Sequence, residues 1–77
     1  MRMRDFKALR YGAYRVYWKS GGSSIATIGM TWDGGRWIAC ANWINPATWE
    51  QDVKNAVRSI SSMSLIEPVD YKNDGVK

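Results

Sequence analysis

Alternating apolar and polar positions predict three β-strands within the first 44 residues. Residues 13–19 alternate so that two sets of side chains face opposite ways. One set is Tyr14, Val16 and Trp18, and the other is Arg15, Tyr17 and Lys19. Residues 24–32 and 36–44 are rich in β-branched and aromatic residues, and Asp33-Gly34-Gly35 separates them. Because glycine pairs between such runs are typical of β-hairpins, we predict a three-stranded antiparallel meander.

The glycine pair also predicts how the hairpin strands pair. If Gly34-Gly35 form a two-residue loop, Trp32 lies opposite Trp37. One face of the hairpin is then apolar throughout, with the residues Ala26, Ile28, Met30, Ala39, Ala41 and Trp43. The other face is mixed and includes Thr27, Gly29, Thr31, Ile38, Cys40 and Asn42. We expect the apolar face to be the core face, because its two small alanines leave room for a helix.

The next apolar repeat predicts an amphipathic helix over residues 46–62. Asn45 is a good N-cap, and Pro46 is a good first helical residue. One continuous stripe holds the apolar residues Trp49, Val53, Ala56, Val57 and Ile60. The predicted fold class is therefore α+β, with this helix packed on one face of the meander.

The two ends of the chain have weaker patterns. Residues 1–10 suit either a short helix, with Asp5 as N-cap and Gly12 as C-cap, or a flexible basic arm. Residues 65–69 suit a short strand, which Pro68 would restrict to a sheet edge. The polar residues 70–77 are typical of a frayed tail. We expect residues 1–77 to form one small domain.

The composition argues against enzyme chemistry and against bound cofactors. The chain has no histidine, the commonest general acid–base group, so its single cysteine, Cys40, has no imidazole to activate it. The carboxylates of Asp33, Glu50 and Asp52 have local roles in a turn and at a helix N-terminus. No spacing suits a metal site or a phosphate loop. We therefore expect a non-catalytic protein without a metal, a cofactor or a small-molecule substrate.

Positive charge is concentrated near the N-terminus. Residues 1–19 carry six basic side chains against one acidic residue, while the whole chain has a net charge of +4. Aromatic residues are interleaved with these cations, and this combination is typical of nucleic-acid binding. The candidate contacts are Arg2, Arg4, Lys7, Arg10, Arg15, Tyr17, Lys19 and Arg36. In the alternative interpretation, the cations only keep the surface hydrated and an edge strand unpaired.

The aromatic content supports a second hypothesis, a protein-interaction module. The chain has five tryptophans, and so small a domain rarely buries five indoles, so we expect one or two to be partly exposed. Tryptophan is enriched at binding hot spots, and the candidates are Trp18, Trp32 and Trp37. The partner would be another protein or a second copy of the chain. This hypothesis describes a small inhibitor or regulator of the phage or mobile-element type.

The expected location is cytoplasmic, without membrane association. A lone cysteine suits a reducing compartment. The charged N-terminus is not followed by an apolar block, and no apolar run approaches the ~20 residues of a membrane span.

The predicted order of elements resembles that of known nucleic-acid-binding domains. A helix, three strands and a helix resembles the order in double-stranded-RNA-binding domains, which carry a basic cluster at the start of the last helix. Here Glu50 and Asp52 occupy that region. Over residues 13–60, three strands followed by a helix also resembles the plant AP2-type and integrase arm-binding domains. That second resemblance implies a sheet that enters the major groove.

Overall fold

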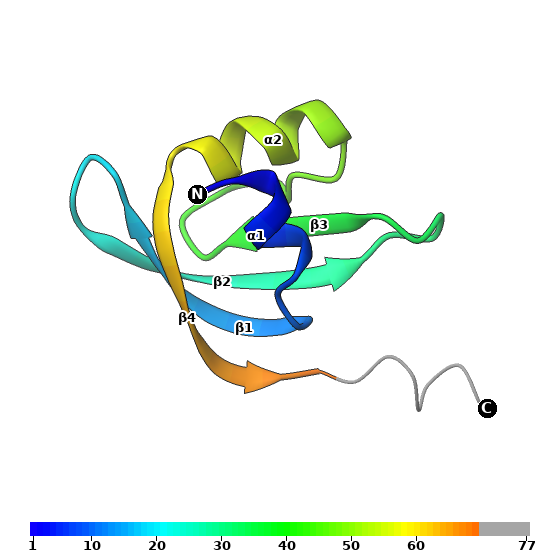
Figure 1. Cartoon of the computed structure of the whole chain (residues 1–77), viewed down its shortest axis with the longest axis horizontal. Coiled ribbons are helices and arrows are strands. Elements are labelled where there is room, and N and C mark those ends of the chain that lie inside the picture. Colours follow the sequence, from blue (N-terminus) through cyan, green and yellow to red (C-terminus); the bar gives the residue numbers. More distant parts are fainter. Residues whose placement is uncertain (70–77) are drawn as a thin grey trace.

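The protein consists of a four-stranded antiparallel sheet with two helices on one face. The computed structural model describes residues 1–69 (Figure 1). In chain order the elements are α1 (Met3–Lys7), β1 (Gly12–Trp18), β2 (Ser23–Met30), β3 (Arg36–Cys40), α2 (Glu50–Arg58) and β4 (Ile60–Pro68). The strands are arranged in the order β3-β2-β1-β4. This architecture confirms the predicted α+β class, while the predicted tail at 70–77 lies outside the described residues.

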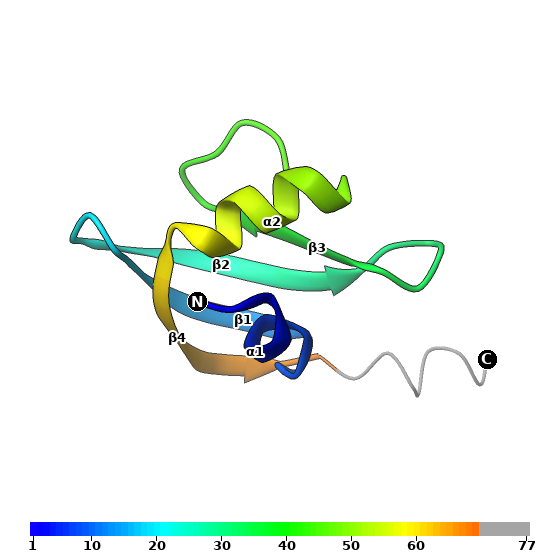
Figure 2. The same ribbon diagram turned by 45° about the horizontal axis from the view of Figure 1, so that its top comes forward.

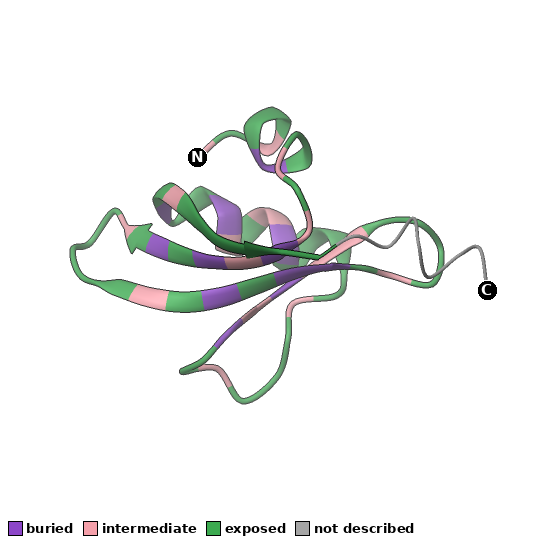
Figure 3. Cartoon of the chain, turned by 90° about the horizontal axis from the view of Figure 1, so that it is seen from below, coloured by how far each residue is buried: buried purple, intermediate pink, exposed green. Residues whose placement is uncertain are grey.

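The core lies between the sheet and the two helices. Figures 1 and 2 show α1 and α2 on the same side of the sheet. Phe6 of α1 and Val57 of α2 are both fully buried, and they belong to one apolar cluster with the sheet residues Val16, Ile28 and Ile38. Buried positions alternate with exposed ones along β1 and β2 (Figure 3). The predicted faces of the first strand are correct, since Tyr14 and Val16 are buried while Arg15 and Tyr17 are exposed.

The predicted register of the hairpin is wrong, because β3 is shifted along β2 by an odd number of residues relative to the prediction. The first pair is Met30↔Arg36, and Ile28 lies opposite Ile38. The loop is longer than two residues because the Thr31 N–H donates to the Gly35 carbonyl at 2.9 Å. An odd shift turns a strand over. The buried residues of β3 are therefore Ile38 and Cys40 in place of the predicted alanines.

The second helix is shorter than the sequence predicts. It begins at Glu50 with Trp49 at the N-cap, so the predicted start at Asn45 and Pro46 is wrong. Before the helix, Ala47 pairs with Ile38 through two backbone hydrogen bonds of 2.8 and 3.0 Å. This pairing satisfies part of the free edge of β3, and it holds the chain extended where the sequence predicts helix.

The N-terminal end of the chain forms the helix α1, and the C-terminal end adds the long strand β4 to the sheet. Of the two predictions for residues 1–10, the structure has the helix, but it begins after Arg2 rather than at Asp5. The last strand runs over nine residues beside β1, longer than predicted, and it is an edge strand as Pro68 requires. Gly12 permits this pairing because its φ is +148° and a Cβ there would lie 2.2 Å from the Glu67 carbonyl oxygen.

Candidate functional site

The structure distributes the predicted nucleic-acid contacts over both faces of the sheet. Arg15 and Tyr17 project from the face that carries no helix, which we call the open face. Arg2, Arg4 and Lys7 are exposed in or beside α1, on the opposite, helical side. The N-terminal cations and the open face therefore do not form one surface.

Arg10 and Arg36 lie beside the aromatic residues that follow α1. The Arg10 side chain is exposed, and its carbonyl accepts a 2.7 Å hydrogen bond from the buried Tyr14 hydroxyl. The Arg36 guanidinium is half-buried on the helical side, 4.6 Å from the centre of the Tyr11 ring. It also donates to the Phe6 carbonyl at 3.4 Å. Arg36 therefore ties β3 to α1.

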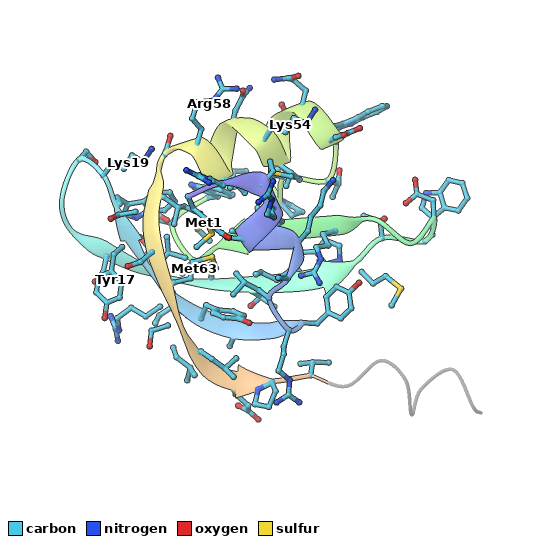
Figure 4. All side chains as sticks on the ribbon, in the orientation of Figure 1. Met1, Tyr17, Lys19, Lys54, Arg58 and Met63 are labelled. Carbon is cyan, nitrogen blue, oxygen red and sulfur yellow. The ribbon has the colours of Figure 1, made fainter. Side chains whose placement is uncertain are left out.

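A basic cluster forms where α2 leads into β4. We define it as Lys19, Lys54 and Arg58 (Figure 4). The Lys19 N–H donates to the Ser59 carbonyl at 3.0 Å, which brings the β1–β2 turn to the end of α2. Lys54 lies one helical turn before Arg58, and it forms an ion pair with Glu50 at 3.5 Å. Two of these three cations were absent from the sequence candidates, because nothing in the sequence pairs residue 19 with residue 59.

The amino group of Met1 lies beside this cluster. It donates a hydrogen bond to the Ile60 carbonyl. Burial, and then the positive charge of Lys19, lower the pKa of this amino group. Both effects disfavour the charged form of the amino group, burial first and the nearby positive charge of Lys19 second.

A cleft of about 450 Å³ opens at the other end of α2. Three segments line it: α1, the β2–β3 loop and the start of α2. Among the lining residues, Phe6 and Val53 are buried and apolar, while Lys7, Asp33 and Glu50 are exposed and charged. The cleft therefore combines an apolar base with a charged rim.

The carboxylates at the cleft already have partners. Asp33 accepts hydrogen bonds from the Thr31 hydroxyl and from the Gly35 N–H, and these bonds lower the pKa of its carboxyl group. Glu50 is paired with Lys54. Within residues 1–69, Lys7 has neither an ion pair nor a hydrogen bond from its side chain. Lys7 is thus the available charged group at this rim.

Two exposed tryptophans are next in sequence to residues that line the cleft, although neither of them lines it. Trp32 lies in the β2–β3 loop and is 98% exposed, and its neighbours Thr31 and Asp33 both line the cleft. Trp49 is 77% exposed and lies between the lining residues Thr48 and Glu50. Helical periodicity placed Trp49 in the core stripe. The acidic first turn that begins at Glu50 is the sequence signal that would have placed it at the helix start.

The other two tryptophan candidates are half-buried. The Trp18 ring lies 6.1 Å from the Trp43 ring, and its indole N–H donates to the Ser24 hydroxyl at 3.0 Å. The Trp37 indole N–H donates to the Met30 carbonyl at 3.2 Å. Trp18 and Trp37 therefore have partners within the fold, whereas Trp32 presents its whole ring to solvent.

The described residues contain little that suits metal or thiol chemistry. Within residues 1–69, no three His, Cys, Asp or Glu side chains are grouped so as to hold a metal ion. Cys40 is buried, and burial raises the pKa of its thiol to about 11. In the same part of the chain, no helix has the length and apolarity needed to cross a membrane.

Comparison with known proteins gives no relative. No protein-family model, curated protein or solved structure matches this chain significantly. Any functional inference rests on the residues themselves.

Proposed function

We propose that the protein is a non-catalytic nucleic-acid-binding module that contacts phosphates through its helical side. The observation that carries this proposal is the basic cluster of Lys19, Lys54 and Arg58, which the β1–β2 turn and α2 bring together. Cations held close together attract a polyanion more strongly than the same cations spread over a surface, since each phosphate contact releases condensed counterions.

The cations of α1 extend this surface. Arg2, Arg4 and Lys7 are all exposed. Phe6, in the same short helix, is fully buried in the core, so α1 is packed onto the protein rather than free as a basic arm. The binding surface is therefore largely preformed, which lowers the entropy lost on association.

The balance of charge also favours the helical side. The helices, their flanks and Lys19 carry six basic residues, Arg2, Arg4, Lys7, Lys19, Lys54 and Arg58, against the acidic Asp5, Glu50 and Asp52. Two of these acids lie in the first turn of α2, where Glu50 is ion-paired with Lys54 of the basic cluster, while Lys19 and Arg58 lie towards the other end of the helix. On the open face, the strand residues include Arg15 and Glu67, whose charges are opposite in sign and so cancel in the net charge of that face.

The test is binding of fluorescent oligonucleotides at several salt concentrations. We expect affinity to fall steeply with salt, and the double variant K19Q/R58Q to reduce the slope of log K against log salt by about 2. The matched control R10Q/R15Q removes the same net charge away from the cluster, and should reduce the slope much less. Circular dichroism checks that both variants fold.

Two results would contradict the proposal. One is that neither DNA nor RNA binds at low salt. The other is that the two double variants weaken binding equally, since this would mean that net charge acts without any particular surface.

A protein partner is the second candidate function. The observation that favours it is Ile44, which is 97% exposed in the connection between β3 and α2. An exposed aliphatic side chain of this size suits an apolar contact with another protein or a second copy. Sedimentation of the wild-type chain and of Ile44→Ser tests the second-copy form. A concentration-dependent dimer that the variant abolishes, at all salt concentrations, would support it.

A further inference from the structure

The cleft and its two indoles have features that the fold itself does not require. Trp32 is almost fully exposed, so its ring contributes little buried area to stability. Trp49 occupies the N-cap of α2, where Ser, Thr, Asp or Asn would satisfy a backbone N–H. Its side chain makes no capping hydrogen bond. Both indoles are therefore free to contact a ligand.

The charged groups around the cleft define where an anion fits. Lys7 and Arg36 line it on the side of α1 and β3. Asp33 and Glu50 line it beside the two indoles, and their negative charges repel phosphate there. An anionic group is therefore best placed at Lys7, whereas an uncharged flat group suits the surfaces of Trp32 and Trp49.

These groups match the two parts of a nucleotide. Nucleobases stack on exposed aromatic rings regardless of sequence, and phosphates pair with nearby cations. In a duplex the faces of the bases are covered by their neighbours, so stacking on an indole requires an unpaired, unstacked strand. Met3, Phe6 and Lys7 line the cleft along α1, and Met1, just before that helix, lies beside the basic cluster. A strand can therefore follow α1 from one site to the other.

We propose that the cleft binds single-stranded nucleic acid, with bases stacked on Trp32 and Trp49 and a phosphate at Lys7. This inference rests on the proposed function and names its substrate class. The basic cluster holds the backbone of the strand, and the cleft distinguishes single strands from duplexes.

The experiment compares one oligonucleotide sequence as a single strand and as a duplex. Binding is followed by anisotropy of the labelled nucleic acid and by tryptophan fluorescence of the protein. The double variant W32A/W49A removes the exposed indoles, and Ile66→Ala, at an exposed position of β4, serves as its control. Thermal unfolding shows whether the fold is retained, and we expect no loss because both indoles lie largely in solvent.

The expected result is a preference for the single strand and quenching of indole fluorescence on binding. The double variant should lose tenfold or more in single-strand affinity, since it removes both rings on which the bases stack. Its salt slope should stay unchanged because no cation is removed. Free AMP should bind far more weakly than the strand, because it engages the cleft without the basic cluster.

Each contrary outcome has a distinct meaning. If single strand and duplex bind equally, and W32A/W49A binds both as the wild type does, the cleft inference is wrong while the proposed function stands. If no nucleic acid binds under any condition, both are wrong. If the double variant loses only self-association or binding to another protein, the indoles form a protein-binding surface and the inference is overturned.

Discussion

The indole of Trp37 occupies the space in which residue 29 would carry a side chain. A Cβ built on Gly29 would lie 2.1 Å from Cζ2 of Trp37, and the two residues are directly opposite in the β2–β3 register. An aromatic ring over a glycine on the neighbouring strand shields exposed backbone and fixes the pairing. This contact therefore helps to hold β3 in its observed register.

Replacing Gly29 should destabilise the protein. In Gly29→Ala the new methyl group collides with the Trp37 ring, which must leave its position. We expect a loss of about 1–3 kcal/mol in the free energy of unfolding, measured by urea denaturation. Thr27→Ala, on an exposed position of the same strand face, is the control and should change stability by much less. Equal stability of the two variants would contradict the contact.

Replacing Gly12 should also destabilise the protein, because of its backbone conformation and its close approach to β4. Its φ of +148° is strained for a residue with a side chain, and a Cβ would lie 2.2 Å from the Glu67 carbonyl oxygen. We expect Gly12→Ala to loosen β4 from β1. Hydrogen exchange should then accelerate at the β1–β4 amides while the β2–β3 amides stay protected. Uniform acceleration would mean that the whole sheet has lost stability instead.

Replacing Phe6 should lower both the stability of the protein and its affinity for nucleic acid. Its ring is fully buried and anchors α1, so Phe6→Ala should cost about 3–5 kcal/mol or release α1 from the core. In the second case Arg2, Arg4 and Lys7 are no longer held against the folded protein, and affinity for nucleic acid should fall at low salt. Leu9→Ala, at a half-buried position, is the milder control. Unchanged affinity in a folded Phe6→Ala chain would show that the α1 cations do not contribute.

Cys40 should make stability depend on alkaline pH. Burial raises the pKa of its thiol from 9.0 to about 11, so between these values the unfolded chain loses this proton while the folded chain keeps it. Stability is therefore retained below pH 9 and falls as the pH rises towards 11. Cys40→Ala should flatten this dependence only in part, because burial also raises the pKa of Tyr14.

A kinetic measurement tests the same burial. The folded protein should react with iodoacetamide at pH 8.5 much more slowly than the urea-unfolded chain, because the thiolate is the reactive form. Similar rates for the two states would contradict a buried, protonated thiol.

Local patterns in the sequence determined the class of fold and much of its core. Alternation along residues 13–19 identified the buried side of β1, since successive side chains of a strand must point to opposite faces. The positions of Val53 and Val57 identified the buried side of α2 for the equivalent reason at helical spacing. The sequence also predicted that some indoles would be exposed, because so short a chain has too little interior to cover five.

Tertiary structure decided the pairing of strands and the position of the candidate sites. The glycine pair marked the hairpin, but the loop from Thr31 to Gly35 set its register, and the burial of Ile38 depends on that register. Lys19 lies beside the end of α2 only because its backbone N–H donates a hydrogen bond to the Ser59 carbonyl. Periodicity reports which face of one element is apolar, whereas the partner of that face depends on contacts between residues far apart in the chain. The cleft arises from such contacts, since three separate segments of the chain form its walls.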